Sequence, residues 1–168
     1  MRTRKGVRAM LQIRNYRLEV KIGTVTFFVI NLESSNCPLC QMLLFVRGTR
    51  KRVFYKSEEE KITLIIRRLY CENCKRIHHE LPDCIVPYKR YGAEVIENIV
   101  NGKGAEAPCP EGTVKRIRGW WKAVVTYFLN IQKTLEEKLP AEFSKPPAFR
   151  EIVRAVANSN HWVFAHQV

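Results

Sequence analysis

Apolar and polar residues alternate along the first part of the chain. Apolar side chains recur at every second position in three short runs, within residues 11–13, 18–22 and 25–29. Such alternation turns one face of a strand inward and the other outward, so it predicts two or three short β-strands. Residues 2–30 also carry seven arginines and lysines against one acid, Glu19. We therefore describe residues 1–32 as a basic N-terminal segment with short strands.

The strand pattern continues through residues 33–88. A polar break at 33–36 is followed by a strand or hairpin over 42–55, a charged turn at 57–61, and a β-branched strand over 62–70. Residues 77–81 alternate again before prolines interrupt the pattern. β-Branched residues fit the pleated surface of a sheet. This region is therefore expected to be β-rich.

Two pairs of cysteines interrupt these strands. They stand as Cys-x-x-Cys motifs separated by thirty residues, at Cys37, Cys40, Cys71 and Cys74. A Cys-x-x-Cys turn lets two thiolates reach one ion, and two such turns complete the tetrahedral shell that zinc prefers. The pattern predicts one structural Zn²⁺ within a zinc ribbon. Four protein ligands leave no open position for a substrate, so the site is expected not to be catalytic.

The same four cysteines are compatible with chemistry other than zinc binding. Free thiols, a redox-active pair and an iron–sulfur cluster all remain alternatives, but a redox pair is usually found in a βαβ setting that this sequence lacks. No export signal is recognisable before the motifs, so we expect a reducing cytoplasm rather than disulfides. Cys84 and Cys109 stand alone and are interpreted as incidental thiols, with Cys84 as a reserve ligand.

The sequence His78-His79-Glu80 follows the second cysteine pair. Adjacent residues of a strand point to opposite faces, so His78 and His79 are not expected to chelate one ion together. The spacing of a zinc protease motif is missing, and no second acidic cluster completes a two-metal site. We therefore expect solvated or core histidines here and no enzymatic activity.

The hydrophobic period changes from two to about 3.6 after Tyr91. A first helix ends at Asn101-Gly102, a proline-containing loop follows, and a second, long helix begins near residue 110 with its apolar line through Val114, Ile117 and Trp121. These residues predict a helix-turn-helix-like unit over 89–140. Residues 141–168 are expected to form a last helix and a tail. The expected fold class is therefore α+β, a β-rich ribbon followed by helices.

Basic residues follow one side of the long helix. Lys115, Arg118 and Lys122 recur at spacings of three and four, and Arg116 flanks them. That spacing places them on a common face, as in a recognition helix that meets DNA. The alternative, an ordinary solvated helix face, explains the same spacing about equally well.

Overall charge narrows the class of partner. The chain has 29 lysines and arginines against 16 acids, a net charge of +13. A surplus of this kind favours polyanions such as DNA or RNA. With 46% hydrophobic residues the chain can form a core, and no apolar run is long enough to cross a membrane. DNA is the expected partner, RNA the alternative, and the oligomeric state is left open.

Several segments together resemble a known kind of protein. They are CPLC at 37–40, IIRRLYCENCKRIHHELPDCIVPYKRYGAEVIENI at 65–99 and CPEGTVKRIRGWW at 109–121. They resemble an uncharacterised bacterial zinc-ribbon family and, more distantly, the zinc-ribbon and helix-turn-helix region of insertion-sequence transposases. The resemblance implies a DNA-binding accessory or regulatory module without the transposase nuclease. Gln41 departs from the pattern, which often places glycine after the first cysteine pair.

Two other functions fit the same residues. One is a protein-interaction module in which the ribbon and an outward-facing Trp120 dock a partner. The other is an RNA-binding or ribosome-associated zinc ribbon, which shares the charge argument. Binding of duplex DNA and of RNA across a salt series separates these alternatives.

Overall fold

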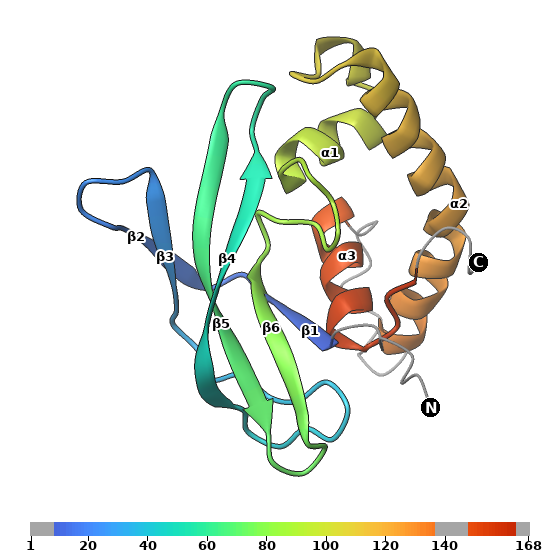
Figure 1. Cartoon of the computed structure of the whole chain (residues 1–168). Coiled ribbons are helices and arrows are strands. Elements are labelled where there is room, and N and C mark those ends of the chain that lie inside the picture. Colours follow the sequence, from blue (N-terminus) through green and yellow to red (C-terminus); the bar gives the residue numbers. More distant parts are fainter. Residues whose placement is uncertain (1–8, 137–147, 164–168) are drawn as a thin grey trace, which may run out of the picture.

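The structure is a computed structural model that describes residues 9–136 and 148–163. A curled β-sheet forms one side of the molecule and helices form the other (Figure 1). The fold class is therefore mixed α+β, as predicted. The strands are β1 (Ala9–Ile13), β2 (Tyr16–Val20), β3 (Thr26–Asn31), β4 (Phe45–Tyr55), β5 (Lys61–Cys71) and β6 (Arg76–Pro82). The helices are α1 (Ala93–Val100), the 3₁₀ turn η1 (Gly104–Glu106), α2 (Glu111–Glu136) and α3 (Phe149–Asn158).

Strand β5 is the centre of the sheet. It pairs antiparallel with β4 along its whole length. Its other edge is shared by β3, which runs parallel to its first half, and β6, which runs antiparallel to its last residues. β1 then adds parallel to β6, and β2 adds antiparallel to β3. The strands predicted before residue 32 thus belong to the same sheet as those of the predicted ribbon.

The two halves of β5 bury opposite faces. Ile62, Leu64 and Ile66 are buried on the face that meets the helices. Leu69 and Cys71 are buried on the other face, where the cysteines gather. Side chains of a strand alternate between faces, so Arg68 lies on the same helix-side face as Ile66. Because the buried face changes between Ile66 and Leu69, Arg68 is exposed. The helices therefore cover only part of that face.

Helix α3 lies between β1 and α2 (Figure 1). The Asn158 side chain accepts a hydrogen bond from the Gln12 backbone amide at 2.6 Å and donates one to the Gln12 carbonyl at 3.0 Å. It thereby satisfies the exposed edge of β1 as a further strand would. Phe149, Ile152, Val153 and Val156 are buried and form the apolar side of this helix, which is the last helix that the sequence predicts.

Helix α2 is a single helix of 26 residues, and Gly119 does not interrupt it. Val114 and Ile117 are buried as the sequence predicts, but Trp120 rather than Trp121 is the more buried indole, at 8% exposure. The expectation that the apolar line runs through Trp121 is therefore wrong in detail. Trp121 packs beside it, edge-on to Phe149 at 5.0 Å between ring centroids. Trp120 is covered by Trp162 and Lys89, which the spacing along α2 alone does not reveal.

The α1–α2 connection contains η1 and spans residues 101–110. The helix-turn-helix interpretation stays a prediction, as do the domain boundaries. The boundary at residue 140 and the first basic residues lie outside the described part of the chain. None of the helices in the described residues is long and apolar enough to cross a membrane.

Candidate metal centre

The four cysteines of the two Cys-x-x-Cys motifs come together at one end of the sheet. Cys37 and Cys40 lie in a turn before β4, which the Asn36–Leu43 bridge closes. Cys71 is the last residue of β5, and Cys74 lies in the turn that leads into β6. Because β5 and β6 pair through Cys71 and Arg76, the hairpin holds the second motif directly beside the sheet.

The two cysteine turns share a backbone conformation. The residue after each motif is left-handed, with φ of 62° at Gln41 and 55° at Lys75. In each turn a backbone amide points at the first sulfur, Leu39 N at 3.4 Å from Cys37 Sγ and Cys74 N at 3.3 Å from Cys71 Sγ. Amides in these positions stabilise negative charge on sulfur. Gln41 therefore occupies a position where glycine is common for steric reasons.

The spacing of the sulfurs suits one metal ion. All four Sγ atoms lie within 4.8 Å of one another, with Cys37–Cys74 at 3.8 Å and Cys40–Cys71 at 3.5 Å. A tetrahedron with metal–sulfur bonds of about 2.3 Å has edges of about 3.8 Å. All four cysteines are free thiols. The cluster could therefore hold one ion without rearrangement of the chain.

The protonation of the thiols also favours a cation. A backbone hydrogen bond from Met42, supported by the Asn73 side chain, lowers the pKa of Cys40 to about 6. The hydrogen bond with Cys40, followed by burial, raises the pKa of Cys74 to about 12. Burial raises the pKa of Cys37 as well. The thiolate of Cys40 is thus favoured over those of Cys37 and Cys74, and a bound metal ion would favour the thiolate form of its ligands.

His78 borders the cluster. It is fully buried, and its Nε2 lies 3.5 Å from Cys37 Sγ. Burial lowers the pKa of His78, so the neutral ring is favoured. Within the described residues its Nδ1 has no hydrogen-bond partner. His79 lies on the opposite face of β6, so the two histidines are separated as the alternation of a strand predicts.

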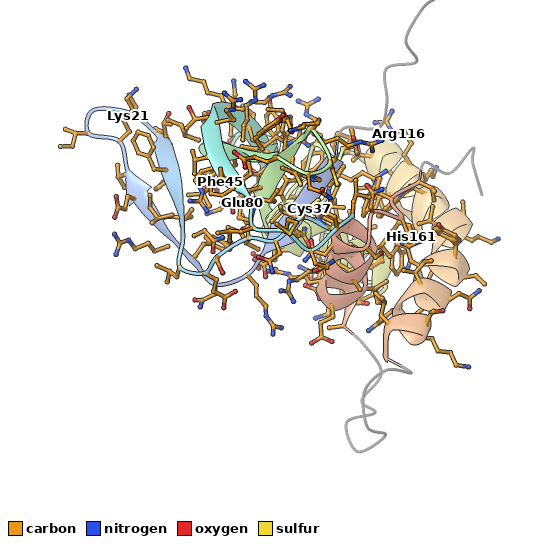
Figure 2. All side chains as sticks on the ribbon, turned by 90° about the horizontal axis from the view of Figure 1, so that it is seen from below. Lys21, Cys37, Phe45, Glu80, Arg116 and His161 are labelled. Carbon is orange, nitrogen blue, oxygen red and sulfur yellow. The ribbon has the colours of Figure 1, made fainter. Side chains whose placement is uncertain are left out.

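A buried carboxylate anchors the loop that carries the first cysteine pair. Glu80 is 1% exposed and accepts two hydrogen bonds from Arg67, at 2.8 and 2.9 Å. Ser35 Oγ and Asn31 Nδ2 also donate to Glu80 Oε2, at 2.7 and 3.0 Å. Figure 2 shows Glu80 and Cys37 in the interior, far from the peripheral Lys21. The network joins β3, β5, β6 and the residues just before Cys37.

Comparison with known proteins gives one match. Residues 37–118 match the family model of DUF6431, a domain of unknown function. No curated protein and no solved structure matches the chain. The match begins at the first cysteine of the cluster, includes all four cysteines, and ends within α2. The description of this family names no activity.

The remaining cysteines lie apart from the cluster. Cys84 follows β6 and packs beside Tyr16, and burial raises the pKa of its thiol. Cys109 lies in the connection between α1 and α2. Neither belongs to the group of side chains that could hold the ion. The reserve role considered for Cys84 is therefore not supported by the geometry.

The four basic residues predicted to contact nucleic acid lie on different parts of α2. Lys115 and Lys122 are exposed, and Lys115 pairs with Glu111 at 2.8 Å. Arg118 lies against the η1 turn. A Cβ atom added to Gly104 would come within 2.5 Å of Arg118 Nη2, so the guanidinium group packs directly on this glycine. Arg116 lies on the other flank of the helix and lines a hollow with Lys89 and Arg90. The structure thus brings three of them to one side of α2 and leaves Arg116 beside the segment of residues 88–91.

Proposed function

We propose that this protein is a non-enzymatic, zinc-dependent DNA-binding module, in which one structural Zn²⁺ organises the sheet and basic surfaces contact DNA. The observation that carries the proposal is the four-cysteine cluster, a closed ligand set inside a chain with a net charge of +13. The resemblance to transposase recognition regions supports an accessory or regulatory role at mobile elements. The fold supports it in being a β-rich region followed by helices.

Zinc fits the cluster better than the alternatives. Four thiolates in a tetrahedron form the commonest structural zinc site, and the sulfur separations agree with zinc–thiolate bonds. Four cysteines also ligate iron–sulfur clusters, but such a cluster requires room for bridging sulfides between the ligands. Sulfurs in mutual contact at 3.5 and 3.8 Å favour a single small ion. Because the shell is closed, the ion is proposed to stabilise the fold and not to activate water.

The basic side of α2 is the proposed duplex-binding surface. Lys115 and Lys122 are exposed on the face opposite the buried Val124 and Phe128, and Arg118 flanks them. Exposed cations at this spacing can reach phosphates along one groove of DNA. The pairing of Lys115 with Glu111 is fully on the surface, so a phosphate can replace the carboxylate at little cost.

Replacing Lys115, Arg118 and Lys122 together with alanine tests this surface. The logarithm of the binding constant falls linearly with the logarithm of the salt concentration, and each phosphate contact on duplex DNA contributes about 0.9 to this salt slope. The triple variant is therefore expected to have a salt slope smaller by about 2.7. The buried side of α2 is unchanged, and circular dichroism and zinc content should match the parent protein. Fluorescence anisotropy with a labelled duplex across a salt series measures the effect.

A charge-matched control removes three other exposed cations, Lys21, Lys51 and Lys61. It has the same net charge as the α2 variant, so it separates a local contact from a general loss of positive charge. Equal salt slopes in the two variants would contradict a role for α2. Tighter binding of RNA than of DNA by the parent protein would favour the RNA alternative.

The structure does not favour the interaction-module alternative as the sequence suggested it. That interpretation relied on an outward-facing Trp120, but Trp120 is buried and stacks with Trp162 at 6.3 Å between ring centroids. The Lys89 ammonium also lies over the Trp120 ring, 3.9 Å from its centroid. Trp120 thus belongs to the core and is not available to a partner.

A further inference from the structure

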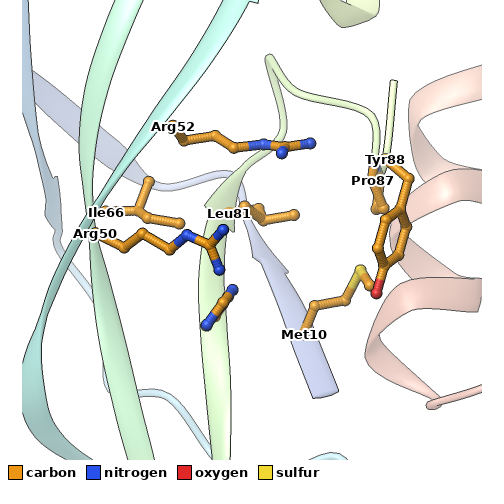
Figure 3. Close-up of a pocket in the computed structure, with 8 residues that line it drawn as sticks. Met10, Arg50, Arg52, Ile66, Leu81, Pro87 and Tyr88 are labelled. Atoms are coloured by element: carbon orange, nitrogen blue, oxygen red, sulfur yellow. The ribbon is translucent and has the colours of Figure 1, made fainter. Parts of the chain in front are cut away.

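A second basic surface lies on the helix-side face of the sheet. Two adjoining hollows meet there, one of about 190 Å³ between the sheet and the Pro87–Tyr88 segment, the other of about 430 Å³ along the uncovered part of β5 and β6. Both are lined by Arg50 and His79. We call this continuous depression the arginine groove, because its cationic side chains are Arg50, Arg52 and Arg68. In Figure 3, Arg50 and Arg52 extend from β4 toward Tyr88.

The groove is electrically unbalanced. No carboxylate lines either hollow, and none of the three arginines is ion-paired within the described residues. Burial, followed by the nearby charge of Arg50, lowers the pKa of Arg52. The Nε of Arg52 is buried without a hydrogen-bond partner in the described part of the chain. Buried donors usually have a hydrogen-bond partner, and the guanidinium group matches the geometry of carboxylates and phosphates.

Tyr88 forms one wall of the groove in an unusual conformation. Its φ is 60°, a left-handed value that is rare for a bulky residue, and its side chain is 43% exposed. Strain of this kind costs stability and is concentrated at binding sites. The conformation turns an aromatic ring toward a row of arginines, with Met10 beneath it (Figure 3).

We propose that the arginine groove binds single-stranded DNA, with phosphates at Arg50, Arg52 and Arg68 and a base stacked on Tyr88. Proteins that bind single-stranded nucleic acid commonly use a cationic groove with an aromatic side chain. The cations bind the phosphates of the backbone, and a base of any type can stack on the aromatic ring. A duplex presents its phosphates on a convex surface that does not enter a cleft between a sheet and a loop. The choice of DNA over RNA rests on the function proposed above, whereas the groove itself does not depend on α2.

The test compares two variants with the same net charge. Arg50→Gln/Arg68→Gln removes two groove cations and leaves the partly buried Arg52 in place. Lys51→Gln/Lys61→Gln removes two exposed cations from the opposite face of the same strands. We expect about tenfold weaker binding of a labelled twenty-nucleotide oligo-dT by the groove variant, and a salt slope smaller by about 1.4. The control variant should bind nearly as the parent does, and zinc content and circular dichroism should be alike in all three.

Tyr88→Leu isolates the stacking contribution. Leucine at this left-handed position has the same backbone strain as tyrosine. The variant therefore removes the aromatic ring without relieving that strain. We expect about tenfold weaker oligo-dT binding with an unchanged salt slope, because no phosphate contact is lost. Binding equal to that of the parent protein would remove Tyr88 from the proposal.

The outcomes separate this proposal from the duplex function. The α2 triple variant should lose duplex binding and keep oligo-dT binding, whereas the groove variant should do the reverse. Equal oligo-dT affinities for the groove and control variants would overturn the groove proposal even if duplex binding by α2 holds. Preference for oligo-U over oligo-dT, or complete competition by thymidine monophosphate at equal nucleotide concentration, would also overturn it.

Discussion

Replacing Cys71 with serine is expected to abolish metal binding and to unfold the β-rich part of the protein. Cys71 is fully buried at the end of β5, so its loss removes a ligand and places an unsatisfied hydroxyl beside three thiols. Metal binding contributes on the order of 10 kcal/mol to small zinc domains, which is comparable with the whole stability of a typical domain. Elemental analysis and circular dichroism of the purified variant measure both losses.

Cys84→Ser is the matched control for this prediction. Cys84 is partly buried, whereas Cys71 is fully buried, and Cys84 lies outside the cluster of sulfurs. Its replacement should leave the metal content unchanged and cost no more than a typical point mutation, about 1 kcal/mol. Equal damage from the two variants would move Cys84 into the metal site and contradict the ligand set.

Glu80→Gln is expected to destabilise the protein by about 3 kcal/mol. The substitution keeps the shape of the side chain but removes the charge that pairs with Arg67. Both oxygens of Glu80 accept hydrogen bonds, so in either orientation the new amide nitrogen faces a donor. Breaking a buried pair by neutralising one partner is costly because the other charge stays desolvated, although Arg67 is 31% exposed and keeps some hydration. Urea unfolding of the metal-loaded protein measures the change.

The exposed pair of Arg17 and Glu19 provides the comparison. Its side chains are 63% and 49% exposed, so Glu19→Gln should change the free energy of unfolding by less than about 0.5 kcal/mol. If Glu80→Gln costs no more than Glu19→Gln, the network around Glu80 does not anchor the loop before Cys37. Replacing both Arg67 and Glu80 with leucine should recover part of the stability lost in Glu80→Gln, because no buried charge is then left unpaired.

Local patterns predicted much of the fold. The β-branched run before Cys71 forms β5, and the 3.6-residue spacing after Phe149 forms α3. Long-range pairings were not predictable in this way. The parallel pairing of β1 with β6, and the hydrogen bonds between Gln12 and Asn158, join residues far apart in the sequence. No local spacing records such contacts.

The candidate sites show the same division. The cysteine cluster follows from spacing alone, because each Cys-x-x-Cys motif brings two ligands together without help from the rest of the chain. The Arg67–Glu80 pair was not predicted from the sequence. Continuing the β5–β6 hairpin register by one residue beyond Arg68 and His79 places Arg67 opposite Glu80. The arginine groove had no signal in the sequence, since it depends on the switch of buried faces along β5 and on how Pro87 and Tyr88 fold back over β4.

Metal analysis of the parent protein tests the central claim most directly. Elemental mass spectrometry of protein purified without chelator is expected to find one zinc ion per chain, because the four sulfurs form a complete and closed ligand shell. Removal of that ion with a strong chelator should unfold the β-rich region. Iron together with sulfide, or a fully folded protein without metal, would contradict the account.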